Sequence, residues 1–478
     1  MRESEKALFH RYPELEAKRM LVELLDEPDR YNHTLESFIS RVTCRLAWGH
    51  SEASDELKQR ARELLIGVSP TGALPNKLPF LMALPDWLSP AKAWERRRAL
   101  TERTWFQSMQ SQVHEEIVNK TAAPSWMKIF LEGRSKWGFE SDMEGAYAVG
   151  MHGIAGALTI AAPMQTFCLA MAHYPQFLPM LHDELDRVCG DRPPVSEDRP
   201  NLPFLRAVIR ECFRWRPPVP TGIPHYLIQN DEYNGYHIPK GSTIHPLEWL
   251  VFILANNRPL LTLSSRAISR DPAMFPDPET FNPLRWVKPE YPSYQEPLTQ
   301  YPTIINSTQF GYGRRMCQGQ AVTDEDLLIG IGSIAWMFNI SQKPDNVLTP
   351  DWTQPSKLSR IGMNEKASIS NEELNTGVTI CEDATTRTSP AKKTKPAYKP
   401  LEWGDITQKP SDPTLDYSIL LIAKPIPFKF SLRPRDAERA NKMRELFQQG
   451  VERGEYTESR EYWGPNQGRD KPLGWSKV

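Results

Sequence analysis

The feature that most constrains this chain is a single cysteine held between glycines in residues 310–319, which follow the pattern F-x-x-G-x-R-x-C-x-G. The next stretch, residues 321–339, is apolar enough to form a buried helix, so Cys317 should lie at a helix N-terminus. Backbone amides without helical partners and the positive end of the helix dipole meet there, and we therefore expect a lowered thiol pKa. Such a thiolate could be the axial ligand of a haem (heme) iron.

Other residues of this loop fit the same interpretation. Gly313 and Gly319 suit a backbone that needs a positive φ or a close approach to a flat macrocycle. Arg315 could pair with a haem propionate, and Phe310 opens the pattern. The alternative is an ordinary buried cysteine in a turn, although five fixed positions rarely coincide by chance.

The loop resembles the cysteine-ligand signature of the cytochrome P-450 family, the haem-thiolate monooxygenases. Two further motifs similar to those of the family stand upstream in the expected order, an E-x-x-R pair at residues 211–214 and F-x-P-x-R-W at residues 281–286. The resemblance implies that Glu211, Arg214 and Arg285 bond one another in a buried cluster that braces the haem loop. An exposed helix ion pair of small energetic value is the alternative for the first two.

The fold class that the resemblance implies is mainly α with small β-sheets (α+β), the cytochrome P-450 fold. The similarity covers about residues 13–339 and resumes at residues 415–434, which indicates one haem-thiolate domain over residues 1–340 and 414–434. Family members of this type begin with a membrane anchor, a sheet and two helices. We expect that N-terminal part to be missing here.

Residues 142–173 predict the longest apolar helix, and Ala-Gly-Ala-Leu-Thr at residues 155–159 is similar to the family's central A-G-x-[DE]-T. The resemblance implies that Thr159 is the hydroxyl that helps deliver protons to dioxygen, with small residues before it that let the haem approach. Leu158 replaces the usual acid, which leaves the proton relay open. Pro163 should kink the helix just beyond this point. Thr159 could instead be a β-branched core residue.

Residues 221–225, Thr-Gly-Ile-Pro-His, resemble the strand that lines the pocket beside the haem. His225 stands where the family often places a partner for a haem propionate, although a lone histidine in a strand is often just a satisfied surface or core residue. Residues 236–244 predict a strand, a turn and a second strand.

Three stretches depart from the family pattern. Residues 250–266 match nothing in it and are apolar but too short to span a bilayer, and we interpret them as a translated non-coding segment or a membrane-contacting loop. Residues 341–413 are rich in Thr, Lys, Asp, Glu, Ser and Pro and predict a disordered insertion. Residues 435–478 read as a polar C-terminal tail, helical near its start.

Composition indicates which kinds of partner and which cellular compartment to expect. A net charge of −1 over 478 residues gives no nucleic-acid signal. Six scattered cysteines indicate a reducing compartment rather than a disulfide scaffold. The sequence has no apolar run long enough to predict a membrane anchor. The resemblance implies the cytosolic face of the endoplasmic reticulum membrane, and without an anchor we expect a cytoplasmic or peripheral location.

The function that the resemblance implies is insertion of one oxygen atom from O2 into a small organic substrate, with electrons from NADPH through a flavoprotein reductase. The fungal secondary-metabolism type is the nearest. Two alternatives stay open: a non-catalytic or misfolded haem-binding remnant, and a haem-thiolate isomerase or peroxide-dependent enzyme, which Leu158 favours.

Overall fold

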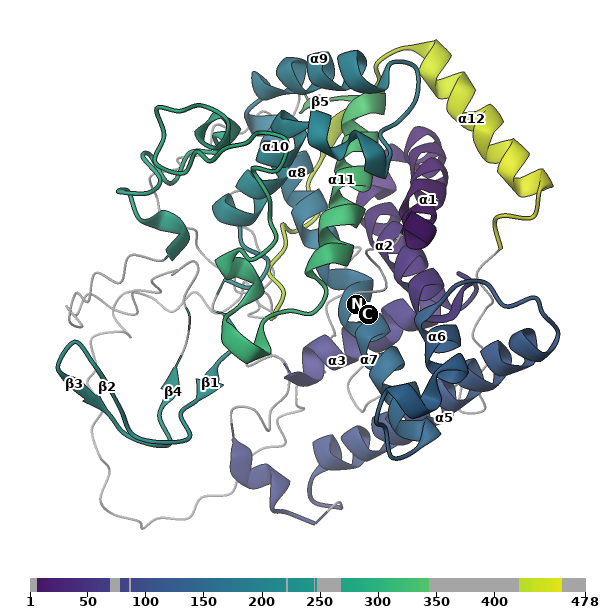
Figure 1. Ribbon diagram of the computed structural model, residues 1–478, viewed down its shortest axis with the longest axis vertical. Helices are drawn as coiled ribbons and strands as arrows, with labels where there is room; N and C mark the ends of the chain where they lie inside the picture. The colour runs from purple at the N-terminus through teal and green to yellow at the C-terminus, as the bar shows by residue number, and fades with distance from the viewer. Residues whose placement is uncertain are drawn as a thin grey trace, which may run out of the picture.

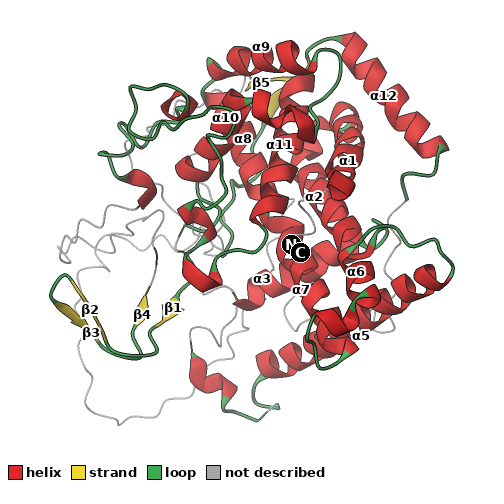
Figure 2. Cartoon of the chain, in the orientation of Figure 1, coloured by secondary structure: helices red, strands yellow, loops and turns green. Residues whose placement is uncertain are grey.

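The computed structural model describes residues 7–68, 78–85, 87–220, 222–244, 246, 268–343 and 421–457. Across these residues helices predominate and the strands form small antiparallel sheets, as predicted (Figures 1 and 2). The helices are α1 (Ala7–Asp26), α2 (Tyr31–Trp48), α3 (Ser54–Val68), α5 (Pro90–Val118), α6 (Trp126–Glu132), α7 (Asp142–Thr159), α8 (Ala161–His173), α9 (Phe177–Cys189), α10 (Pro203–Trp215), α11 (Gln320–Met337) and α12 (Ala437–Glu452). The strands are β1 (His225–Tyr226), β2 (Asp231–Tyr233), β3 (Tyr236–Ile238), β4 (Thr243–Ile244), β5 (Phe338–Gln342) and β6 (Phe430–Pro434).

Helix α2 joins two hydrophobic cores. Its side chains Phe38 and Val42 belong to the core formed with α1, α8 and α11. Its side chains Ala47 and Trp48 belong to the core formed with α3, α5 and α7. Nearly every residue of α2 is buried, including the charged Glu36, Arg41 and Arg45, so the helix is enclosed on all sides rather than along one apolar stripe. The helix is therefore the shared wall of both cores, and Figure 1 shows it at the centre of the molecule.

The apolar stretch of residues 142–173 is two helices rather than one. The first, α7, ends at Thr159, and α8 begins at Ala161. Pro163 explains the break, because its ring has no N–H for the Thr159 carbonyl and clashes with that carbonyl. The break directs α7 into the core with Trp48 and α8 into the core with Phe38.

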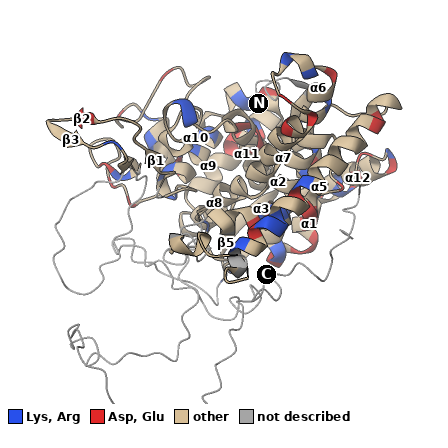
Figure 3. Ribbon diagram, turned by 90° about the horizontal axis from the view of Figure 1, so that it is seen from below, with Lys and Arg blue, Asp and Glu red and all other residues tan. Residues whose placement is uncertain are grey.

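The stretch at residues 142–173 is long and apolar enough to cross a membrane, but most of it is buried inside the protein. Helix α8 carries no Lys, Arg, Asp or Glu and is drawn wholly in tan in Figure 3. Burial against neighbouring helices accounts for its apolar composition without a bilayer.

Each sheet has two antiparallel strands, in the pairs β1–β4, β2–β3 and β5–β6. The predicted strand–turn–strand at residues 236–244 is present, but its strands pair with β2 and β1 rather than with each other. Strand β6 lies in the stretch at 415–434 where the similarity to the family resumes, and it pairs with β5, with Phe430 opposite Gln342. Two residues of the predicted insertion at 341–413 therefore belong to a strand.

The described residues after β6, 435–457, pack against the body of the protein. Arg435 and Arg439 both bond the Asp186 carboxylate on α9, and Met443 of α12 is fully buried. The hydroxyl of Tyr456 donates to the Leu15 carbonyl at 3.0 Å. The predicted helix at the start of this segment is confirmed as α12.

The segment at 250–266, nearly all of 341–413 and the chain after residue 457 lie outside the described residues.

Candidate functional site

Glu211 on α10 is the centre of a buried polar cluster. Its carboxylate is 0% exposed and accepts hydrogen bonds from Arg214 at 2.7 and 2.9 Å and from the Arg285 Nε at 3.1 Å. The Trp286 Nε1 and the Asn282 amide, both at 2.9 Å, complete the set. The structure thus brings together the three residues expected to meet, in an arrangement unlike the exposed ion pair.

The two guanidinium groups are satisfied by backbone carbonyls as well as by Glu211. Arg214 donates to the carbonyls of Ser269 and Pro278 at 3.0 and 2.7 Å, and Arg285 donates to that of Pro276 at 3.0 Å. Burial alone would raise the pKa of the Glu211 carboxyl, but the charges and hydrogen bonds of the arginines outweigh it and lower that pKa. The carboxylate therefore stays charged inside the protein.

Contacts connect this cluster to the cysteine loop. Gln309 donates to the Ser269 hydroxyl at 2.9 Å, and the carbonyl of the same serine accepts from Arg214. One residue later, the ring of Phe310 packs against that of Phe213 with centroids 5.5 Å apart. Helix α10 thus holds the start of the loop through the Phe213 ring and, by way of Ser269, through Arg214.

Cys317 lies where the loop meets α11. Its amide donates to the Phe310 carbonyl at 2.8 Å, and its carbonyl accepts from the Gln320 side chain at 3.1 Å. The Sγ accepts a hydrogen bond from the Gly319 amide at 3.3 Å. The residue is exposed, so the thiol is accessible to a ligand.

The lowered thiol pKa expected at this position is wrong for the protein chain by itself. The surrounding protein desolvates the thiolate and raises the pKa of Cys317, and the Gly319 hydrogen bond offsets only part of this. The expectation counted the helix dipole and left out the cost of removing the thiolate from water.

The other described cysteines are all buried. Burial raises the pKa of Cys168 and Cys189 to about 12 and raises those of Cys44 and Cys212 as well. Cys317 is therefore the exposed thiol of the described chain.

The loop glycines leave room beside this thiol. Gly311 and Gly313 have φ values of +84° and +61°, and a Cβ added at either would meet no heavy atom within 4 Å. The positive φ predicted for Gly313 is confirmed, whereas Gly319 has a φ of −87°. An accessible thiol beside a glycine backbone with open space fits a flat macrocycle held through sulfur.

The C-terminal half of α7 presents one open face. Ala155 is exposed and Thr159, one turn later, is half-buried, with its hydroxyl donating to the Ala155 carbonyl at 2.9 Å. The expectation that residues 155–157 all leave room for a haem is wrong for two of them. A Cβ on Gly156 would lie 3.1 Å from the Thr43 side chain, and Ala157 is fully buried.

Two expected propionate partners are near the surface. His225 is half-buried on β1, opposite Ile244, and Arg315 is exposed at the end of a short 3-10 helix, Gly313–Arg315. Their predicted role stays a prediction.

Sequence reasoning missed several contributors. Asn282 and Trp286 lie within the F-x-P-x-R-W motif, which could have indicated them, but Asn282 takes part through its backbone amide. Nothing in the sequence indicates the role of Ser269 or Gln309, because it depends on how distant loops meet.

Comparison with known proteins agrees with this geometry. A sequence model of the cytochrome P-450 family matches residues 35–253 and 259–363. The chain is 32% identical over 342 residues to cytochrome P-450 monooxygenase virE of Hypocrea virens, and 30% identical over 345 residues to cytochrome P-450 monooxygenase fogE of Aspergillus ruber. Each alignment covers 70% of this chain but only 59% and 60% of those relatives.

The chain therefore spans about three fifths of the length of the curated relatives it matches. The family match covers well over half of the sequence, includes the Glu211 cluster and Cys317, and agrees with the mainly helical fold. The chain belongs to the cytochrome P-450 family.

Proposed function

We propose that this chain is a haem-thiolate monooxygenase, which inserts one oxygen atom from O2 into a small organic substrate. The observation that carries the proposal is Cys317, an exposed thiol in an open glycine loop that is tied to a buried charged cluster. Relatives named as monooxygenases support the class of reaction.

Cys317 would hold the iron through its Sγ. No group of three His, Cys, Asp or Glu side chains in the described parts of the chain could hold a metal ion, so the remaining ligands would come from a macrocycle. The haem, when bound, supplies the redox chemistry that activates dioxygen. The chain positions the sulfur: the Gly319 amide donates to it, and the Phe310 carbonyl and the Gln320 side chain fix its backbone.

Thr159 would deliver protons together with water. Its hydroxyl donates to the Ala155 carbonyl, and its oxygen can accept a hydrogen bond from a water molecule. To pass a proton on, the hydroxyl would turn away from this carbonyl, release its own proton and take one from the water. Leu158 is buried and has no acid to offer, so the proton would arrive through the solvent side of α7. Arg315 and His225 would pair with the propionates.

The proposed electron source is NADPH, through a flavoprotein reductase on the cytosolic face of the endoplasmic reticulum membrane. One observation favours a second candidate, an isomerase or peroxide-dependent enzyme: the helix that carries Thr159 has Leu158 in place of an acid.

The test begins with haem binding. The full chain is reconstituted with haem, and the ferrous–CO difference spectrum is recorded for wild type, Cys317→Ala and Cys212→Ala. We expect the thiolate-type Soret band in wild type and in the variant of the buried Cys212, and its loss in the Cys317 variant. Wild type without the band would mean a remnant that cannot hold the cofactor, and an unchanged band in Cys317→Ala would refute the assignment.

Turnover separates the remaining candidates. Product formed with reductase and NADPH supports the monooxygenase, whereas product formed only with added peroxide, or rearrangement without either, supports the second candidate.

A further inference from the structure

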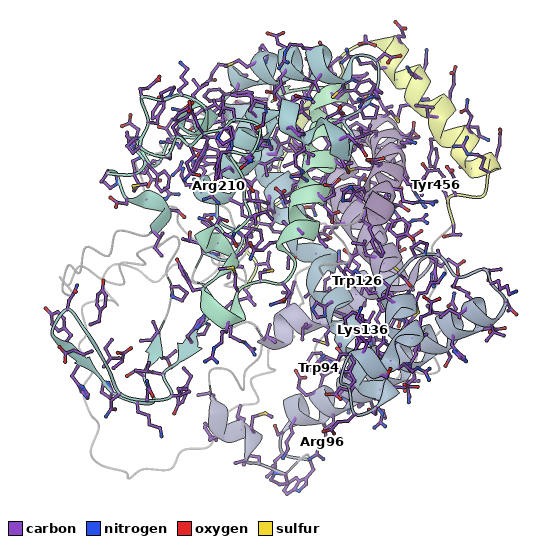
Figure 4. The ribbon with its side chains drawn as sticks, in the orientation of Figure 1. Trp94, Arg96, Trp126, Lys136, Arg210 and Tyr456 are labelled. Carbon is purple, nitrogen blue, oxygen red and sulfur yellow. The ribbon has the colours of Figure 1, made fainter. Side chains whose placement is uncertain are left out.

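A cavity of about 210 Å³ lies between α6, α7 and the loop that joins these two helices. Figure 4 labels Trp126, at the start of α6, and Lys136, which follows the end of that helix. The described residues lining the cavity are Trp126, Ile129, Phe130, Trp137, Phe139, Ala148, Val149 and His152.

Four of these lining residues are tryptophan or phenylalanine, and contacts within the protein hold their rings. The Phe130 and Phe139 rings meet edge to face with centroids 5.6 Å apart. Gly145 of α7 makes room for Phe130, since a Cβ at this glycine would lie 2.1 Å from that ring. The Lys136 Nζ lies over the Trp137 ring, 4.9 Å from its centroid. A ligand ring would therefore meet aromatic walls that are already formed, so ordering them would cost little free energy.

The hydrogen-bonding character of the cavity comes from His152. None of the described lining residues is Asp, Glu, Lys or Arg, and His152 alone has a side-chain acceptor, because an indole nitrogen only donates. Its Nδ1 lies 2.6 Å from the Ala148 carbonyl, which can only accept, so that nitrogen carries the ring proton. In the neutral imidazole the Nε2 is then an acceptor, and no group in the described part of the chain donates to it. The lining therefore favours a ligand with an O–H or N–H donor.

We propose that this cavity binds a single aromatic ring that carries an O–H or N–H donor, the chemistry of a phenol. The ring would lie among the tryptophan and phenylalanine side chains, and its donor would bond the His152 Nε2. The volume suits one ring, since sites for whole drug-sized molecules measure about 300–1,000 Å³. Aromatic faces also attract cations, but Lys136 already lies over the Trp137 ring and would repel a cationic ligand.

The site lies on the face of α7 that carries Thr159. Ala148, His152, Ala155 and Thr159 follow one another at intervals of three or four residues, which places them on one stripe of the helix. His152 precedes Thr159 by two turns, about 10 Å along the helix axis. The binding does not rest on the proposed oxygenase function, because none of the lining residues is assigned to the haem or to proton delivery.

The test is ligand-observed fluorine NMR on the full chain, with 4-fluorophenol as the probe and 4-fluorotoluene as a match of similar shape without a donor. We expect saturable line broadening of the phenol. His152→Phe keeps a planar ring and removes the acceptor, so it should weaken binding of the phenol by about fivefold and change that of 4-fluorotoluene by less than about twofold. His114→Phe, the same change at an exposed histidine of α5, should alter neither.

A second variant covers the case in which His152→Phe does not fold, which a thermal melt would show. Ala148→Phe places a ring in the cavity from a half-buried position of α7, and it should abolish the broadening of both probes. Equal binding of the phenol by wild type and folded His152→Phe, or undiminished broadening with folded Ala148→Phe, would overturn the proposal. Wild type that broadens neither probe would also overturn it, and a dimer that Ala148→Phe dissociates would then assign this face to a second copy of the chain.

Discussion

The Glu211 carboxylate has no access to solvent, and it pairs with the guanidinium groups of Arg214 and Arg285, which are also buried. Removing it leaves Arg214 and Arg285 charged in the interior without a counter-ion. We expect Glu211→Ala to lower the free energy of unfolding by about 3–5 kcal/mol, measured by urea denaturation.

The control is Glu27→Gln, which breaks the exposed pair with Arg30, whose side chains are 58% and 61% exposed. That change should cost under about 1 kcal/mol, since water screens such pairs. An equal loss of unfolding free energy in the two variants would contradict the view that burial makes the Glu211 cluster important for stability.

Thr159 gives a prediction about chemistry rather than stability. Thr159→Val keeps the shape of the side chain and removes its hydroxyl, while Thr159→Ser keeps the hydroxyl. If the hydroxyl passes protons, the valine variant should form at least about tenfold less product per NADPH consumed, with the serine variant near wild type. Product and NADPH are counted in the same reaction, and equal yields in both variants would remove Thr159 from the proton path.

At the scale of elements, Glu36 joins three of them. It lies on α2, and its carboxylate pairs with Arg62 of α3 at 2.7 Å and with Lys424 of the segment before β6. Burial alone would raise the pKa of Glu36, but the two cations outweigh it and hold that pKa at about 2, against an ordinary value of 4.5. The carboxylate therefore stabilises the fold at every pH above its unfolded value.

This stabilisation should be lost as the pH falls from about 4.5 to about 2, since the unfolded chain takes up the proton first. Over that window the free energy of unfolding of wild type should fall by about 3 kcal/mol more than that of Glu36→Gln. Chemical denaturation at a series of pH values measures the difference. Parallel curves for the two proteins would contradict the prediction.

The elements show what could be predicted from the sequence. The apolar stretch at residues 321–339 indicated α11, because the composition of one continuous stretch is enough to predict a buried helix. Pro163 predicted a kink at the place where the structure has the break between α7 and α8. The motif at residues 281–286 indicated that Arg285 meets Glu211, since the family pattern carries that contact.

What could not be predicted depends on distant contacts or on desolvation. The pairing of β6 with β5 joins strands separated by nearly ninety residues, most of them outside the described chain. The space at Gly156 is taken by Thr43 on another helix, and the raised pKa of Cys317 follows from protein mass around the thiol. The order of residues along the sequence shows neither which distant residues come into contact nor how strongly the folded protein desolvates a group.

At the scale of the molecule, the segment after β6 holds together helices from both ends of the chain. The Arg45 guanidinium donates to the Glu455 carbonyl at 2.8 Å, Tyr456 bonds α1, and Arg439 lies over the Trp336 ring of α11. Truncation after Pro434 should lower the free energy of unfolding by about 3 kcal/mol or more, because burial of Met443 alone is worth about 2 kcal/mol.

Truncation after Thr457 is the matched control and should leave the thermal midpoint unchanged, since none of the contacts above lies beyond that residue. Equal midpoints for the two shortened chains would mean that α12 adds nothing to stability.

The segment at 250–266 gives the last prediction. The family match is interrupted only at residues 254–258, so the expectation that all of 250–266 departs from the family pattern does not hold for 250–253 and 259–266. Deleting 250–266 should raise the soluble yield, because the stretch is apolar with low charge and carries no group for the site. Sequencing of mature transcripts is the direct test. A segment present in every transcript, together with a deletion that aggregates more than the full chain, would show that it is a real part of the protein.

The Glu211 cluster also limits how early this part of the protein can fold during its synthesis. Its acid is made 71 to 75 residues before the Asn282 amide and the Trp286 indole that it binds. At roughly 5–20 residues per second, a ribosome needs about 4–15 s to supply them. During that interval Arg214 is the cluster partner already made, so α10 cannot complete the burial of its acid until the motif at residues 281–286 has left the exit tunnel. The cysteine loop at residues 310–319 can therefore dock on the cluster only late, after most of the helices have been translated.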